Sequence, residues 1–202
     1  MNERPLLRVL GFWAQILFIA AYLGILSTAM FVFQFGFGEM PCPLCIVQRM
    51  AMIAATLGAV YIVVQTLRGT LTTPRYLTGL GMALVGAIVG ATMSTRQIEL
   101  HILPGDPGYG TAIMGLHLYT WALITFVVVA LFVGVVLMFG TALEPVAPTG
   151  RAGRTIAWVI VWAFFATIVL NMVVVFVEEG FNWFLPDDPT GYELLRQLGI
   201  TR

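Results

Sequence analysis

The sequence predicts an all-α integral membrane protein with five antiparallel transmembrane helices. Of its 202 residues, 59% are hydrophobic and only 10% are charged, whereas a soluble domain carries about 25% charged residues. A membrane-spanning helix needs about 20 mostly apolar residues. Five segments reach that length, residues 10–33, 46–67, 76–95, 116–139 and 155–177. The bilayer is therefore the expected solvent of most of the chain.

The first apolar segment, residues 10–33, has two interpretations, because Arg4 and Arg8 precede it as they would precede a cleavable signal peptide. A signal peptide has an apolar core of about 7–15 residues and a small-residue cleavage site. This run is longer, and no convincing site of that kind closes it. We therefore expect a membrane helix rather than a leader.

The second span begins beside Cys42 and Cys45, the only cysteines of the chain. Pro43 is tolerated in the first turn of a helix, where its missing N–H would have no partner, so the pair is expected at a helix N-terminus. Thiolates are favoured at helix N-termini and near cations, and Arg49 follows Cys45 by four residues on the same face. A redox dithiol is thus indicated, although Arg49 has snorkelling to the outer surface as its structural alternative.

Two other interpretations of the cysteine pair remain open. A structural zinc site needs four ligands, and His101 and His117 would have to complete it. Alternatively, both cysteines are inert buried thiols, which free cysteines often are.

The later elements follow from small residues and turn formers. Gly86 and Gly90 in the third span have the small-xxx-small spacing that lets helices approach closely. Residues 96–115 are expected to form the longest outer loop, and residues 144–154 a flexible inner link. In the tail, Asp188 is expected to cap a short helix that ends just before Gly199.

The arginines favour one orientation, with the N-terminus inside and the C-terminus outside. Threading the helices back and forth separates the ten arginines into groups of six and four, and the larger group is expected on the cytoplasmic side. This side holds Arg4, Arg8, Arg68, Arg75, Arg151 and Arg154, and the other holds Arg49, Arg96, Arg196 and Arg202. The cysteines then lie at the outer face, where disulfides persist. The net charge is zero, so no basic surface for nucleic acid is expected.

The segment 41–49, Pro-Cys-Pro-Leu-Cys-Ile-Val-Gln-Arg, resembles the signature of the bacterial disulfide bond formation protein B (DsbB) family. Residues 115–121, Gly-Leu-His-Leu-Tyr-Thr-Trp, are similar to segments of its relatives. The resemblance implies a multi-pass protein of the bacterial inner membrane, built as an antiparallel four-helix bundle to which this chain adds a fifth transmembrane helix. Its outer thiol pair would pass electrons to ubiquinone or menaquinone. The resemblance also implies a periplasmic thioredoxin-fold thiol protein as partner. Cys42 and Cys45 would be the quinone-facing pair, and Arg49 would lie beside the quinone ring.

His117 has two interpretations of equal weight. It either protonates or hydrogen-bonds a quinone oxygen, or it is an interfacial histidine held by a backbone carbonyl. The corresponding division of the chain is a four-helix membrane domain over residues 1–140, a cytoplasmic link and fifth helix over 141–177, and an outer tail with a short helix over 178–202.

The chain departs from the DsbB pattern in two places. The loop 96–115 lacks a second cysteine pair, and a fifth span and outer tail are added. Two functions therefore compete. The first is a quinone-dependent thiol oxidoreductase working with one pair. The second is an accessory subunit of a larger membrane complex, in which Cys42 and Cys45 form a structural disulfide. A heme protein using His101 and His117 is disfavoured, because heme bundles place paired histidines at matched depths inside helices.

Overall fold

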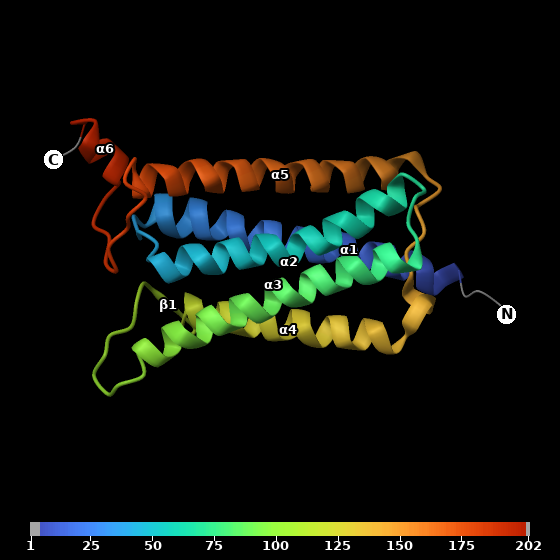
Figure 1. Ribbon diagram of the computed structural model, residues 1–202, viewed down its shortest axis with the longest axis horizontal. Coiled ribbons are helices and arrows are strands. Elements are labelled where there is room, and N and C mark those ends of the chain that lie inside the picture. Colours follow the sequence, from blue (N-terminus) through green and yellow to red (C-terminus); the bar gives the residue numbers. More distant parts are fainter. Residues whose placement is uncertain (1–4, 201–202) are drawn as a thin grey trace.

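A computed structural model describes residues 5–200, and five long helices make up most of this part of the chain (Figure 1). Arg4 and Arg202, used in the orientation argument, lie outside the described residues. The helices are α1 (Pro5–Ser27), α2 (Pro43–Leu67), α3 (Thr73–Leu100), α4 (Leu118–Met138) and α5 (Arg151–Glu179). All five are long and apolar enough to cross a membrane. The predicted all-α membrane fold is confirmed.

The helices alternate in direction, so their connections gather at two ends of the bundle (Figure 1). The start of α1, the α2–α3 link and the α4–α5 link lie at one end. The cysteine segment, the loop after α3 and the C-terminal tail lie at the other. Five of the described arginines accompany the first end, as the threading predicts: Arg8, Arg68, Arg75, Arg151 and Arg154. Which end faces the cytoplasm stays a prediction.

Polar contacts join the helix ends at the first end of the bundle. The Arg154 guanidinium on α5 donates to the Leu67 carbonyl at the end of α2, at 2.8 Å. Thr73 at the start of α3 donates to Glu144 in the α4–α5 link, at 2.9 Å. The Arg8 side chain donates to the backbone carbonyl of the same Glu144, at 3.2 Å. The Arg154 bond satisfies a terminal carbonyl that the end of α2 leaves unpaired. The other two bonds tie the α4–α5 link to α3 and α1.

Small residues let α3 pack closely between α2 and α4. A Cβ atom at Gly86 would lie 2.5 Å from the backbone nitrogen of Ala55 on α2, and one at Gly90 would collide with the Phe126 ring on α4. The predicted close approach at these two glycines is confirmed. The fifth helix packs along α1 and contacts α2, on the side of the bundle away from α4 (Figure 1).

The substitution Gly86→Ala is expected to destabilise the bundle. Its methyl group has no room against the α2 backbone, and such overpacking lowers the free energy of unfolding by about 1–3 kcal/mol. Thermal unfolding in detergent measures the effect as a lowered Tm. Gly81→Ala on the same helix is the matched control, because nothing lies within 4 Å of its added Cβ. Equal Tm values for the two variants would contradict the packing assignment.

The outer loop is shorter than predicted, because α3 continues to Leu100. Residues 96–100 include good helix formers, and no proline interrupts them before Pro104. The remaining loop contains a small hairpin of β1 (Ala112–Ile113) and β2 (Leu116–His117). Residues 116 and 117 are thus strand rather than the first residues of the fourth helix.

The tail helix also differs from its prediction. It is α6 (Glu193–Gln197), with Tyr192 rather than Asp188 at its start. The flexible Gly191 follows Thr190 and separates Asp188 from the helical residues. The predicted end is confirmed, since Gly199 lies just beyond the helix with a φ of +69°, the left-handed conformation that glycine adopts readily.

Candidate functional site

The two cysteines lie at the start of α2, as the sequence predicts. Cys42 is the cap residue and Pro43 the first helical residue, and the Cys45 backbone N–H donates to Cys42 Sγ at 3.3 Å. Both thiols are free, with their sulfur atoms 2.7 Å apart. A disulfide has a bond of about 2.05 Å, so the pair is placed to be oxidised with little backbone movement.

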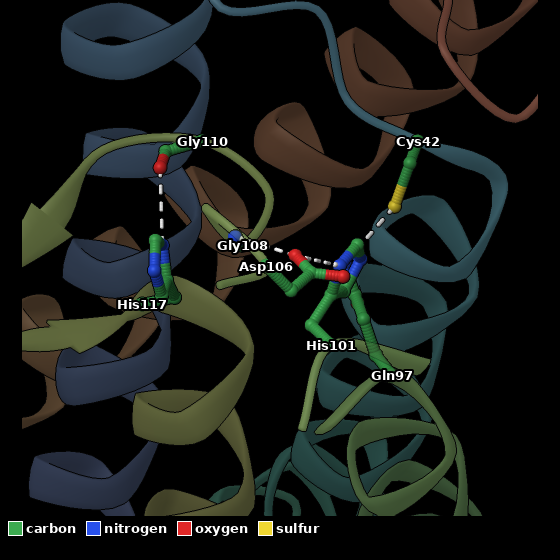
Figure 2. A network of polar contacts seen from close by, with 7 residues as sticks. All are labelled: Cys42, Gln97, His101, Asp106, Gly108, Gly110 and His117. Carbon is green, nitrogen blue, oxygen red and sulfur yellow. Dashed lines mark hydrogen bonds and ion pairs between the residues drawn. The ribbon is translucent and has the colours of Figure 1, made fainter. Parts of the chain in front are cut away.

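A buried glutamine on α3 contacts both sulfur atoms. Gln97 is 1% exposed, and its Nε2 lies 3.2 Å from Cys42 Sγ and 3.5 Å from Cys45 Sγ. Figure 2 shows the Gln97 side chain reaching toward Cys42. Gln48 on α2 donates to Gln97 Oε1 at 2.7 Å, which turns the Gln97 amide nitrogen toward the sulfurs. Hydrogen bonds donated to sulfur favour the thiolate over the thiol.

Cys45 borders an apolar cavity of about 420 Å³ between α1, α2 and α4. Its walls are mostly hydrocarbon and aromatic, and they include Ile25, Phe33, Met52, Leu118, Trp121 and Ala122. Cavities that bind small ligands have volumes of about 300–1,000 Å³ and are mostly apolar, with a few polar groups. Here Cys45, Gln48 and Arg49 supply such groups.

Cys42 instead borders a second, more polar cavity of about 750 Å³ at the loop end of the bundle. Its walls come from the start of α2, the end of α3, the loop after α3 and the tail. They include Gln97, His101, Tyr109, Asp187, Asp188 and Thr190. The two cysteines, although their sulfur atoms are in contact, therefore border different cavities.

Arg49 is held inside the bundle and is only 8% exposed. Its Nη1 donates to Gln34 Oε1 at 2.8 Å, and its Nη2 donates to the Ala29 carbonyl at 3.3 Å. Both acceptors belong to η1 (Thr28–Gly36), the π-helical end of the first span. π-Helical turns are rare and often occur at functional sites. The guanidinium borders the apolar cavity, so the alternative of snorkelling to the surface is wrong.

The loop after α3 is bonded to the segment that precedes α2. The Tyr109 hydroxyl donates to the Met40 carbonyl at 2.6 Å, and the Thr111 N–H donates to Glu39 Oε1 at 3.2 Å. Burial raises the pKa of Tyr109, so this residue stays a neutral donor. Tyr109, Glu39 and Met40 line both cavities and form the boundary between them.

Neither histidine is among the residues that line the apolar cavity. His117 Nδ1 lies 3.0 Å from the Gly110 carbonyl oxygen (Figure 2), and its ring stacks on Tyr119. The role of His117 toward a quinone stays a prediction. His101 Nδ1 pairs with Asp106 Oδ1 at 3.0 Å. The Gly108 N–H and this histidine lower the pKa of Asp106.

Part of the chain matches a known protein family. The model of the family "Disulfide bond formation protein DsbB" matches residues 12–109. Residues 12–109 are therefore similar to the DsbB family. Among curated relatives, "Disulfide bond formation protein B" of Chromobacterium violaceum is 37% identical over 91 residues, which are 45% of this chain and 52% of the relative. The protein of the same name from Haemophilus influenzae is 35% identical over 78 residues, 39% of this chain and 41% of the relative.

The DsbB match covers only part of the molecule. The chain spans about half the length of the curated DsbB relatives it matches, and no solved structure matches it. The matched residues 12–109 contain Cys42, Cys45, Arg49 and Gln97. They end within the loop after α3, so His117, α4, α5 and the tail lie beyond the DsbB match.

Sequence reasoning identified three of the clustered side chains and missed the others. Cys42, Cys45 and Arg49 come together as expected. Gln97 was assigned to a loop, although its spacing of seven residues from Gly90 places it on the same face of a continued helix. No sequence pattern identified Gln34 as a site residue, because nothing in its apolar surroundings indicates a π-helical turn.

Proposed function

We propose that the chain is a quinone-dependent thiol oxidoreductase that generates disulfides at the outer face of the bacterial inner membrane. One observation carries the proposal: Cys45 borders an apolar cavity beside Arg49, while Cys42 borders a separate polar cavity. Such a pair has one sulfur directed toward a lipid-soluble oxidant and the other toward a water-borne thiol. The five membrane-length helices and the names of the DsbB relatives support the same function.

The apolar cavity suits the head group of ubiquinone or menaquinone. Its hydrocarbon and aromatic walls accommodate a ring, and the Arg49 guanidinium at the wall supplies a donor for a carbonyl oxygen. A bound quinone supplies an acceptor of two electrons and two protons. The Cys42–Cys45 dithiol releases two electrons and two protons when it closes to a disulfide, so one pair suffices and the overall reaction balances.

The residues of the chain have separate tasks in this proposal. Arg49 holds the acceptor and stabilises negative charge that develops on its oxygen. Cys45 is the sulfur on the acceptor side. The proton shared with Cys45, together with burial, raises the pKa of the Cys42 thiol, so Cys42 keeps its proton in the resting dithiol. Gln97 stabilises charge on the sulfurs through its amide N–H groups.

Re-reduction would pass through the polar cavity. A thiolate of a periplasmic thioredoxin-fold protein attacks Cys42 Sγ in the disulfide, and the Cys45 thiolate leaves. The partner's second thiolate then attacks the mixed disulfide, which releases the oxidised partner and the Cys42 thiolate. This route places the loop end of the bundle outside and the N-terminus inside, as the arginine distribution favours. Residues 1–140 then form the membrane domain, 141–177 the link and fifth helix, and 178–202 the outer tail.

The accessory-subunit alternative predicts a different state of the cysteine pair. A structural disulfide stays oxidised, whereas a catalytic pair becomes reduced when its oxidant is withdrawn. Thiol trapping of the membrane-embedded protein, with and without quinone depletion, separates them. Accumulation of reduced Cys42 and Cys45 on quinone depletion supports the oxidoreductase, and a bridge that never exchanges supports the alternative.

Replacing Gln97 by Leu is expected to move the pH dependence of thiol alkylation upward. The substitution removes the donor to both sulfurs, and the loss of a hydrogen bond to the charged form makes the thiolate of the pair harder to form by about one pH unit. The thiolate fraction at a given pH below the pKa falls, so alkylation there slows by about tenfold. Iodoacetamide alkylation of the reduced protein over a pH series measures this shift.

Ser94→Ala on the same helix is the matched control. Ser94 is fully buried one turn before Gln97, and its hydroxyl has no hydrogen-bond partner within residues 5–200. Its removal should leave the alkylation profile unchanged. A profile that also stays unchanged in the Gln97→Leu variant would exclude Gln97 from the thiol site.

A further inference from the structure

The fifth helix brings a buried carboxylate to the back of the Arg49 site. Glu178, in the last turn of α5, is 0% exposed. Its Oε1 accepts a hydrogen bond from Gln34 Nε2, and Gln34 Oε1 in turn accepts from Arg49 Nη1 at 2.8 Å. Three buried side chains from α5, η1 and α2 therefore form one continuous relay. It ends at the apolar cavity that Arg49 borders.

The hydrogen-bonding groups at the two ends of the relay, Arg49 and Glu178, fix the orientation of the Gln34 amide. A guanidinium can only donate and a carboxylate accepts, so Gln34 must turn its oxygen to Arg49 and its nitrogen to Glu178. If the carboxylate were lost, the amide would be free to turn over and present N–H groups to the guanidinium. Arg49 would then lose one of its two acceptors.

The charges of Arg49 and Glu178 also favour their connection through Gln34. A buried guanidinium near lipid is costly unless it is paired, and Glu178 provides the compensating negative charge through Gln34. Stability alone does not account for this carboxylate, because its second oxygen, Oε2, has no hydrogen-bond partner among the described residues. A buried polar atom left unpaired costs free energy, so the position carries a local penalty that an apolar residue would avoid.

We propose that Glu178 is a positioning residue for the quinone site: through Gln34 it orients and charge-balances the Arg49 guanidinium at the cavity wall. The inference rests on the proposed function and extends it to α5, a helix outside the matched residues 12–109. Glu178 does not line the cavity, and it takes no part in electron transfer. The added helix thereby becomes part of the quinone site rather than a spacer.

The test is quinone binding in the absence of turnover. Trp121 borders the cavity, so titrating the oxidised protein with ubiquinone-1 in detergent should quench its fluorescence, and a Trp121→Phe variant identifies that signal. Glu178→Gln keeps the shape of the side chain but removes its charge, and a charge-assisted hydrogen bond is about twice as strong as a neutral one. We expect the Kd for the quinone to rise by about tenfold.

Two controls separate positioning from a general structural effect. Glu179→Gln alters the neighbouring, partly exposed acid and should leave the Kd unchanged. In an Arg49→Met background, Glu178→Gln should add little further, because its effect is transmitted through Arg49. Alkylation of the reduced Cys42–Cys45 pair should match that of the wild type in Glu178→Gln and in Glu179→Gln.

The outcomes distinguish this inference from the proposed function. If the wild type binds and reduces the quinone while Glu178→Gln binds it equally well, the positioning role is wrong and the function stands. Equal losses in the wild-type and Arg49→Met backgrounds also overturn the role. A wild type that binds quinone without reducing it overturns only the function, and one that does not bind quinone overturns both.

Discussion

Replacing Cys45 by Ser is expected to abolish quinone reduction while quinone binding persists. Cys45 is the sulfur that borders the apolar cavity, and a hydroxyl can neither form the disulfide nor supply its electrons. The cavity itself changes by only one atom. Single-turnover mixing of the reduced protein with ubiquinone-1, followed by the loss of quinone absorbance, measures the reaction, and tryptophan quenching measures binding.

Cys42→Ser provides the matched comparison. It also removes the disulfide and so the net reaction, but it leaves Cys45 at the cavity and removes the sulfur that borders the polar cavity. A single-cysteine variant of a thiol partner, activated as its mixed disulfide with 5-thio-2-nitrobenzoate, should therefore be attacked by the Cys42 thiolate of the Cys45→Ser protein, which releases 5-thio-2-nitrobenzoate and leaves a trapped mixed disulfide. The Cys42→Ser protein should not form it. Quinone reduction by the Cys45→Ser protein at the wild-type rate would overturn the assignment of the two sulfurs.

Replacing Arg49 by Met is expected to raise the KM for the quinone by about 10–100-fold, since a buried, charge-assisted donor contributes about 1.5–3 kcal/mol. Met fills a similar volume without donating or carrying charge. The variant also leaves Gln34 and Glu178 without their cationic partner, which adds to the loss. Steady-state kinetics over a quinone concentration series gives KM and kcat separately.

Arg49→Lys is the control for this prediction. It keeps the positive charge but loses the planar fork that reaches both Gln34 and the Ala29 carbonyl. An intermediate KM is therefore expected. Wild-type kinetics in the Arg49→Met protein would remove Arg49 from the site and leave Glu178 without a route to the cavity.

The parts of the fold that depend on local physics were predictable from the sequence. Membrane spans follow from the length of apolar runs, and the helix start at Cys42 follows from Pro43 in the first turn. The close approach at Gly86 and Gly90 follows from the spacing of small residues. In each case the signal lies within one segment of the chain.

The parts of the site that depend on tertiary packing were not predictable. Gln34 and Glu178 are 144 residues apart in the sequence, and they meet because α5 packs against α1. The polar cavity at Cys42 likewise needs the tail residues Asp187 and Asp188, and the sequence analysis assigned only a helix cap to Asp188 and no role to Asp187. Gln97 was partly predictable. If the sequence analysis had extended α3 to its observed end, the helical spacing would have put Gln97 on the face toward the thiols.

The most direct test of the central claim is an anaerobic titration that measures both products in the same sample. The purified, reduced protein is mixed with increasing ubiquinone-1 in detergent. Quinol is measured by absorbance, and the Cys42–Cys45 disulfide by mass spectrometry after thiol trapping. The proposal predicts one quinol for every disulfide formed, up to the amount of protein present. Quinone that stays oxidised beside a pair that stays reduced would contradict it.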